Sequence, residues 1–344
     1  MINVLVTGAG GGVGQGIIKS LRMIKDLPIK IVAADMSEMA TGLYSGDEAC
    51  LVEGCSSPSY LDSLAAVFKK FEIDFYFPGT DVELGFCAKN KAHIKNVYGV
   101  ETVISSLETI EIADDKYKTF EFLKKNGFYY PETNYLSEID SISLEYPLIV
   151  KPAVGCRSIG VYKVASYDEL EKHLHTPEGI IVQECVGTDD DEYTCTLVKV
   201  NDQISPVLAL KRVLRSGDTF RAIPVKSEVI ESYVQSVSNH LDIEGGCNFQ
   251  LRLDSRGKPK IFEINSRFSG TTPFCSQLGF NPVEFYLKAK MGHKYNPIVN
   301  YDSVVLRYWS EVVVENEQLR DLAATKFLTP KKVKQLKMFD GEDL

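Results

Sequence analysis

Three oxygen-bearing side chains, Gln250, Glu263 and Asn265, could together bind a metal ion. They lie in segment 246–272, where alternating apolar residues around an Asp-Ser-Arg-Gly turn predict a β-hairpin. Because side chains alternate across a strand, Glu263 and Asn265 share one face, and Gln250 on the partner strand has the parity to face them. Such oxygen ligands suit Mg²⁺, and Arg267 would place a permanent cation beside it. A hairpin with a merely solvated polar face would show the same pattern.

A second candidate for chemistry is the loop that follows Lys151, the last residue of a predicted strand over 146–151. It leads into another strand at 161–164 and contains Gly155, Arg157, Ser158 and Gly160. Because two strands enclose the loop, it differs from a Walker A loop, whose sequence is also absent. Backbone N–H groups and one cation in such a loop can fold over phosphates. The alternative is a plain hairpin, which would be long for its class.

The first residues predict a strand, a glycine turn and a helix, which is a Rossmann-like opening. Gly8, Gly11 and Gly14 fit the G-x-x-G-x-x-G spacing of some nicotinamide-dependent enzymes, and Asp35 lies where a ribose-binding acid would be. Those enzymes also carry a Tyr-x-x-x-Lys pair, and here Tyr286 and Lys290 come far too late in the chain. We therefore favour a structural role for the glycines, which allow a tight turn and close packing of helix on strand.

The composition of the chain argues against several classes of protein. The chain has 344 residues, 44% of them hydrophobic and 25% charged, which is ordinary for a globular protein. A net charge of −9 argues against a nucleic-acid partner. The eight cysteines form no C-x-x-C pair, which favours reduced thiols and a cytoplasmic location. No apolar run has the length of a membrane span, and the first residues do not resemble a signal peptide, so we expect no membrane partner.

The predicted elements divide the chain into three domains, at 1–108, 109–184 and 185–344. Strands and helices alternate through the first, with Thr80 and Asp81 at the carboxyl end of a strand, where open α/β sheets place ligand groups. Strands dominate the later part, at 179–186, 192–200, 206–213 and 220–225, followed by a helix at 227–240. The tail predicts one strand over 304–314, then a helix and a charged end whose role is open.

In order and approximate spacing, these residues resemble the ATP-grasp superfamily, most closely its carbamoyl-phosphate synthase large-chain branch. The resemblance covers residues 1–298, and its most specific parts are VKPAVGCRSIGV and NFQLRLDSRGKPKIFEINSRFSG. It implies an α/β chain in which a Rossmann-like pre-ATP-grasp domain precedes one two-lobed ATP-grasp unit of α+β type.

The resemblance also implies roles for individual residues. Lys116 and Lys151 would neutralise the α- and β-phosphates of ATP, and the glycine loop would close over the triphosphate. Glu192 would bind the ribose hydroxyls. Gln250, Glu263 and Asn265 would hold two Mg²⁺ ions, with Glu263 bridging them. The strand that would contact adenine as a hinge consists of Gln183, Glu184, Cys185 and Val186. The residues expected to act in catalysis are Arg267 and Lys211.

The implied reaction is an ATP- and Mg²⁺-dependent carboxylate–amine ligation through an acyl phosphate, releasing ADP and phosphate. The chain departs from the carbamoyl-phosphate branch, because it has one ATP-grasp unit and reads Phe268-Ser269-Gly270-Thr271 where that branch tends to keep a second arginine. Two other functions stay open: an NAD-dependent sugar epimerase or dehydrogenase that uses the first glycine turn, and a non-catalytic ATP-binding protein.

The expected partners are a small-molecule carboxylate and an amine, with a homodimer as one assembly to test. We expect the substrate pocket to be built from the first glycine turn, Thr80, Asp81 and a set of cations. Those cations are Lys211, Arg212, Arg215 and Arg221, whose charges suggest an anionic substrate.

The hinge and Glu192 predict a preference for ATP. Backbone groups of the hinge would recognise the adenine edge, so ATP with Mg²⁺ should raise the melting temperature and GTP should raise it much less. Thermal shift at equal nucleotide concentrations measures the difference. Equal stabilisation by GTP would contradict the hinge assignment.

Overall fold

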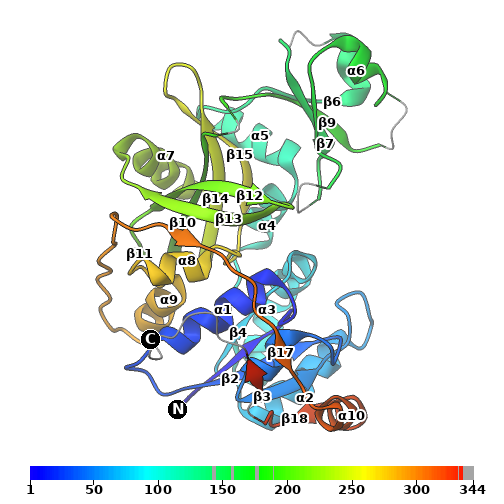
Figure 1. Ribbon diagram of the computed structural model, residues 1–344, viewed down its shortest axis with the longest axis vertical. Helices are drawn as coiled ribbons and strands as arrows, with labels where there is room; N and C mark the ends of the chain where they lie inside the picture. The colour runs from blue at the N-terminus through cyan, green and yellow to red at the C-terminus, as the bar shows by residue number, and fades with distance from the viewer. Residues whose placement is uncertain (142–144, 156–158, 175–177, 189, 332, 336–344) are drawn as a thin grey trace.

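The computed structural model describes residues 1–141, 145–155, 159–174, 178–188, 190–331 and 333–335. Its described strands form an N-terminal six-stranded sheet, a central seven-stranded sheet, a four-stranded sheet and a two-stranded pair (Figure 1). Helices cover the first two sheets, which confirms the predicted α/β class.

The N-terminal sheet is parallel except for one edge strand contributed by the C-terminal tail. In sheet order its strands are β18 (Phe327–Leu328), β3 (Glu48–Leu51), β2 (Ile29–Asp35), β1 (Ile2–Val6), β4 (Phe75–Phe77) and β5 (Glu101–Thr102). The helices of this domain are α1 (Gly12–Met23), α2 (Tyr60–Phe71) and α3 (Leu84–Tyr98), with short 3-10 turns η1 (Thr41–Ser45) and η2 (Asp81–Glu83). The βαβ units predicted from the first hundred residues are present.

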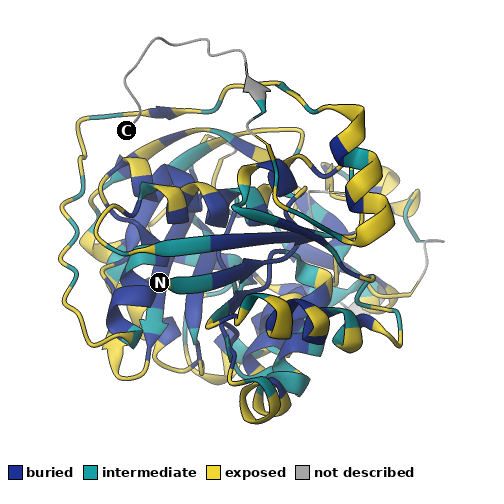
Figure 2. Ribbon diagram, turned by 90° about the horizontal axis from the view of Figure 1, so that it is seen from below, coloured by how far each residue is buried: buried dark blue, intermediate teal, exposed yellow. Residues whose placement is uncertain are grey.

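The apolar second half of strand β1 is buried on both faces, as is usual for a strand inside a parallel sheet. Val4 and Val6 belong to the core that α1 covers, and Leu5 belongs to the core on the opposite face, with residues of α2 and α3. Figure 2 shows the central strands largely buried and the outer faces of the surrounding helices exposed. The sheet therefore holds the carboxyl ends of β1 and β4 in fixed positions.

The seven-stranded sheet is antiparallel and forms the centre of the molecule (Figure 1). In sheet order its strands are β15 (Pro259–Asn265), β14 (Gly245–Leu253), β10 (Glu192–Val200), β12 (Leu208–Arg215), β13 (Asp218–Val225) and β16 (Val305–Leu306), with β11 (Gln203–Ile204) paired to β10. The helices associated with it are α4 (Leu107–Asp114), α7 (Glu228–Ser238), α8 (Thr272–Gln277) and α9 (Pro282–Lys290). Helix α7 packs on one face, over Cys195, Phe249 and Leu251.

The four-stranded sheet forms a separate small lobe (Figure 1). Its strands, in order, are β6 (Thr133–Tyr135), β9 (Ile180–Glu184), β7 (Leu148–Pro152) and β8 (Tyr162–Val164). Also in this part are α5 (Lys116–Lys125), α6 (Tyr167–Glu171) and the 3-10 helix η3 (Leu136–Ser141). A small core of its own, with Leu148, Val150 and Val182, stabilises the lobe.

The C-terminal tail joins the central sheet to the N-terminal sheet (Figure 1). The prediction of one strand over 304–314 is wrong, because the chain leaves the central sheet after β16 and forms a second short strand, β17 (Val312–Val313), which pairs with β19 (Lys334–Gln335). Helix α10 (Asn316–Thr325) follows, and β18 then pairs with β3. The tail is thus a strap between two domains.

A second connection between these domains uses the Tyr-x-x-x-Lys pair. Lys290 on α9 forms ion pairs with Glu101 of β5 at 2.9 Å and with Glu244 at 2.7 Å. The Tyr286 hydroxyl donates to Glu244 at 2.9 Å. The Tyr286 ring packs edge-on against Phe75 and Phe77 of β4, so both residues fasten α9 to the N-terminal sheet, which is a structural role.

Among the described helices, none is long and apolar enough to cross a bilayer. The proposed domain limits at residues 108 and 184 stay predictions.

The strap predicts a stability effect at Leu322, a completely buried residue of α10 in the N-terminal core. Leu322→Ala should lower the free energy of unfolding by about 2–5 kcal/mol, because it leaves a cavity that the surroundings fill only partly. Urea denaturation measures the change. The matched control is Leu306→Ala in the same tail, where the side chain is 63% exposed and the loss should be small. Equal losses would show that the strap does not stabilise the domain.

Candidate active site between the two lobes

A cleft of about 220 Å³ lies between the four-stranded and seven-stranded sheets. The residues that line it include the predicted Lys116, Lys151, Gly155, Gln183, Glu184, Val186, Glu192, Gln250 and Glu263. They come from α5, β7, β9, β10, β14 and β15, together with the loop segments after β7 and β9. The structure therefore gathers at one place residues that lie far apart in the sequence.

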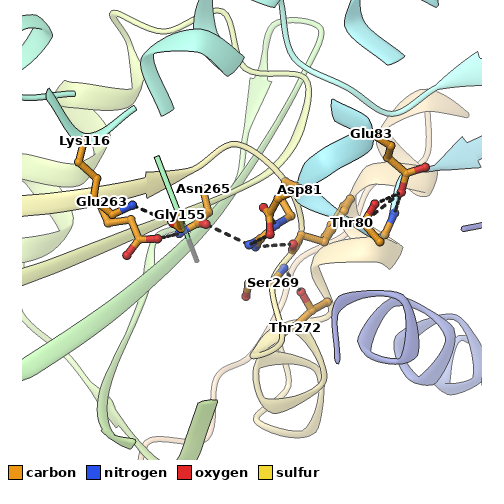
Figure 3. Close-up of polar contacts among 12 residues, drawn as sticks. Thr80, Asp81, Glu83, Lys116, Gly155, Glu263, Asn265, Ser269 and Thr272 are labelled. Carbon is orange, nitrogen blue, oxygen red and sulfur yellow. Dashed lines mark hydrogen bonds and ion pairs between the residues drawn. The ribbon is translucent and has the colours of Figure 1, made fainter. Parts of the chain in front are cut away.

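The register of β14 and β15 sets the oxygen-bearing side chains opposite one another. Gln250 pairs with Glu263 and Asn248 pairs with Asn265, as the alternation predicts, with a bulge after Gln250. The Asn265 amide lies 3.5 Å from Glu263 Oε1, and Figure 3 shows Glu263 and Asn265 near each other. One carboxylate and two amide oxygens are a donor set that fits a hard divalent cation completed by waters and phosphates.

Lys151 is a buried cation at the end of β7, with 5% of its surface exposed. Its ammonium donates to Gln183 Oε1 at 2.8 Å and lies 5.4 Å from the centre of the Phe262 ring. Burial lowers the pKa of Lys151 to about 7; the positive charge of Lys116 acts in the same direction and Glu263 opposes it. A neighbouring polyanion would reverse this shift, because it favours the charged form.

Lys116 begins α5 and reaches toward the glycine loop. Its ammonium donates to the carbonyl of Gly155 at 2.8 Å (Figure 3), and its backbone N–H donates to Ala153 at 2.9 Å. Asp115 caps the helix by accepting from two backbone N–H groups of the first turn. Within the described residues neither Lys116 nor Lys151 forms an ion pair, so two buried lysine amino groups face the cleft without a carboxylate partner. This arrangement fits a polyphosphate.

The rest of the glycine loop is described only in part. Gly160 has a φ of +73° and lies close to Pro152, so the turn there favours glycine. Arg157 and Ser158 lie outside the described residues, and their phosphate role stays a prediction.

The four hinge residues have different environments. Gln183 is buried and connects Lys151 to the Thr133 hydroxyl, to which its amide donates at 2.9 Å. The Glu184 carboxylate accepts a hydrogen bond from the Lys260 ammonium at 2.6 Å, and the Glu184 backbone N–H donates to the carbonyl of Glu132. Glu184 and Val186 line the cleft, whereas Cys185 is not among the described residues that line it.

Glu192 is held between two arginines, which the sequence did not predict. Its carboxylate accepts from Arg212 at 2.5 and 2.9 Å and from Arg252 at 2.8 Å, and only 7% of the residue is exposed. Burial would raise the pKa of Glu192, but Arg212 and Arg252 outweigh it and hold the pKa below its usual range. Arg212 also donates to Gln250 Oε1 at 2.7 Å, so Glu192 helps to orient a predicted metal ligand.

Arg267 contacts the N-terminal domain as well as the oxygen-bearing set. Its guanidinium donates to both carboxylate oxygens of Asp81, at 2.5 and 3.0 Å, and to Asn265 Oδ1 at 3.0 Å. Figure 3 shows Asp81 beside Asn265. Asp81 was expected in the substrate pocket and Arg267 beside the metal, but their pairing depends on domain packing and has no signal in the sequence.

The structure does not gather the four expected substrate-binding cations in the cleft. Arg212 lines the cleft, and because side chains alternate along β12, Lys211 and Arg215 point to the other face of the sheet. Lys211 pairs with Asp191 at 2.8 Å, and both side chains are more than a third exposed. Arg215 and Arg221 contact the Phe220 ring. Lys211 is therefore not among the described residues of the cleft, and the structure does not place it near the predicted metal ligands.

Strand parity could have identified one of the cleft residues that were missed, because Arg252 is two residues beyond Gln250 and so shares its face. Parity does not predict Phe262, which lines the cleft although it directly precedes Glu263. Phe262 is the extra residue of a bulge in β15, where Gln250 pairs with Glu263 and Leu251 pairs with Ile261.

The contacts of the first glycine turn show why glycines and Asp35 occur there. A Cβ on Gly14 would lie 2.3 Å from the carbonyl oxygen of Gly8, so α1 packs on β1 only with glycine there. The Asp35 carboxylate accepts from the backbone N–H groups of Gly10 and Met36, both at 2.8 Å. These contacts assign the glycines and Asp35 to the turn, and the nicotinamide alternative receives no support.

Comparison with known families agrees with this geometry. The model of the ATP-grasp domain matches residues 113–271, and the model of the PylC-like N-terminal domain matches residues 4–103. The chain contains an ATP-grasp domain. The N-terminal domain precedes it, as the resemblance implied.

Relatives and solved structures are similar over most of this chain. The large chain of carbamoyl phosphate synthase from Thermoanaerobacter sp. is 24% identical over 326 residues, covering 85% of this chain and 29% of its own length. This chain thus spans less than a third of that relative. The fold is similar to N5-carboxyaminoimidazole synthetase from Staphylococcus aureus complexed with ADP (TM-score 0.68, 17% identity, 94% and 85% coverage). It is also similar to L-amino acid ligase from Bacillus licheniformis (TM-score 0.65, 18% identity, 87% and 75% coverage).

The buried lysine predicts a pH dependence of stability. Unfolded, Lys151 should titrate near its ordinary pKa of 10.5, against about 7 in the folded protein. Between these values the unfolded chain binds the extra proton, so stability should rise with pH, by about 1.4 kcal/mol per unit relative to Lys151→Met. Below pH 7 the difference between the two proteins should be constant. Urea denaturation from pH 6 to 9 measures it, with the exposed Lys118→Met as control, and parallel curves would contradict the shift.

Proposed function

We propose that this protein is an ATP- and Mg²⁺-dependent carboxylate–amine ligase that acts through an acyl phosphate and releases ADP and phosphate. The observation that carries the proposal is the arrangement of the ATP-grasp cleft. Two buried lysines that have no ion-pair partner among the described residues lie on the small-lobe side, and Gln250, Glu263 and Asn265 lie on adjacent strands opposite. The solved ligases of similar fold, one of them complexed with ADP, support the same class.

In the proposed reaction, a substrate carboxylate oxygen attacks the γ-phosphorus of ATP, and the bond to ADP breaks. An amine then attacks the acyl carbon, loses a proton, and phosphate leaves. Lys116 and Lys151 would bind the phosphates, and Arg267 would stabilise negative charge beside Asn265. Bound Mg²⁺, for which we propose two ions with Glu263 between them, would neutralise charge on the phosphates. The second catalytic role proposed for Lys211 has no geometric support.

The nucleotide would lie with its adenine at the hinge. The N–H of Glu184 is already donated to Glu132, so the groups left for the adenine edge are the Glu184 carbonyl and the Val186 N–H. To bind the ribose hydroxyls, the Glu192 carboxylate would accept hydrogen bonds from them while it also accepts from Arg212 and Arg252.

A non-catalytic ATP-binding protein is the second candidate. It would bind ATP without releasing ADP. The presence of all three oxygen ligands and of Arg267 favours the enzyme, because binding alone does not require a group that stabilises the transferred phosphoryl group.

The proposal extends to surroundings and partners. The substrates would be a small carboxylate and a small amine, and no nucleic acid or membrane is involved. The seven described cysteines are free, which supports a reducing, cytoplasmic location. A homodimer stays an expectation that light scattering would test.

The first experiment is a phosphate-release screen of the purified protein with ATP, Mg²⁺ and pools of carboxylic and amino acids. Release that needs one carboxylate and one amine, with formation of an amide, is the expected result. Binding of ATP with no release for any pair would favour the non-catalytic candidate.

Glu263→Gln tests the centre of the proposal. The variant keeps size and hydrogen bonding but removes the carboxylate assigned to the bridging position, so turnover should fall by about 10²–10³-fold. ATP should still bind, because Lys116 and Lys151 are unchanged. The control is Glu228→Gln, an exposed residue of α7 on the other face of the same sheet. Turnover at the unmodified rate with the identified substrates would exclude the hairpin as the metal site.

A further inference from the structure

Glu83, in the N-terminal domain, is a buried carboxylate with an unusually complete set of hydrogen-bond donors. It ends the 3-10 turn η2 and is 2% exposed. Oε1 accepts from the N–H of Gly79, the N–H of Thr80 and the Thr80 hydroxyl, each at 2.9 Å. Oε2 accepts from the hydroxyls of Thr7, Tyr60 and Tyr76, at 2.8, 2.6 and 2.7 Å. Figure 3 shows Glu83 facing Thr80.

These contacts exceed what a helix cap requires. A capping box needs one carboxylate oxygen on the backbone of the N-cap residue, here Thr80. The second oxygen of Glu83 is fixed instead by three hydroxyls, from Thr7 directly after β1, from α2 and from β4. Burial and the charge of Glu83 raise the pKa values of Tyr60 and Tyr76, so both remain protonated donors. The carboxylate therefore has one position relative to the N-terminal sheet.

This network fixes the position of the loop that carries Asp81. Asp81 follows Thr80 directly, and its carboxylate binds Arg267 through two hydrogen bonds. A bidentate pair of this kind has a narrow geometry, so a displaced carboxylate displaces the guanidinium. Arg267 in turn donates to Asn265, whose amide lies 3.5 Å from Glu263. Hydrogen bonds thus connect Glu83 through this loop to the oxygen-bearing set.

We propose that Glu83 is a positioning residue for the active site: it fixes the loop 79–81 so that Asp81 holds Arg267 against Asn265. Its effect on turnover rests on the ligase function proposed above, whereas its effect on Arg267 does not. The alternative is that the network stabilises only the N-terminal domain.

The first test changes donors to Glu83 and leaves Glu83, Asp81 and Arg267 in place. Tyr60→Phe removes one hydroxyl from Oε2, and Thr80→Val removes one from Oε1 while keeping the shape of the side chain. The matched control is Tyr286→Phe, which removes a buried tyrosine hydroxyl from Glu244, outside this network. Melting temperatures of all three variants establish that they fold.

The readout at Arg267 needs no substrate. The exchange rate of its Nε–H with water is measured by nitrogen-15 NMR, with Arg267→Lys to assign the signal. We expect exchange about 10-fold faster in Tyr60→Phe and Thr80→Val, because the bidentate pair with Asp81 is loosened, and no change in Tyr286→Phe. Unchanged exchange in both network variants would overturn the proposal.

Turnover gives the second readout, with the substrate pair found in the phosphate-release screen. Each network variant should lose about 10- to 10²-fold in kcat, since small displacements of a catalytic group are costly, while KM for ATP stays within about twofold. Tyr60→Phe should add little to Asp81→Asn if Glu83 acts through Asp81, because the two changes interrupt one path. Independent, multiplicative losses would overturn the proposal. If the unmodified protein has no activity, the ligase function fails and Nε–H exchange still decides the role of Glu83.

Discussion

The alternation of side chains along β14 is the constraint on which the site depends. Phe249 and Leu251 are completely buried under α7, and Gln250, between them, faces the cleft with Arg252. One sheet thus supplies both the core of the large lobe and one wall of the cleft. A slip of one residue in β14 would move phenylalanine into the cleft and arginine into the core. The packing of α7 therefore fixes the register of the predicted metal ligands.

The two sides of the cleft differ in how their charged side chains are paired. The Glu192 carboxylate forms ion pairs with Arg212 and Arg252. Removing these charged groups from water is costly, and their close pairing offsets that cost. Lys116 and Lys151, on the other side, have only neutral hydrogen-bond partners in the described structure. Burial of positive charge is costly, and an anion between the lobes would offset that cost. We therefore expect the cleft to bind a polyphosphate.

Local patterns predicted local features well. The parity of Gln250 and Glu263 and the first βαβ unit follow from spacing and strand periodicity, which act over a few residues. The cleft lysines were expected only from the resemblance to the ATP-grasp superfamily. Pairings between distant parts did not follow. Arg267 meets Asp81 only because two domains pack together, and the grouping of Lys211 with Arg212 ignored the face of β12 on which each lies. The strand expected over 304–314 failed because the tail crosses between sheets, which hydrophobicity alone does not show.

The strap also has a consequence for how the chain is made. During synthesis β3 leaves the ribosome long before β18, yet β18 covers the edge of the sheet at β3. Until then β3 presents unpaired backbone groups, which are a template for contact between nascent chains. Translation that stops before Phe327 would release a protein with that edge open. A segment that is translated long after β3 thus covers the edge of the sheet to which β3 belongs.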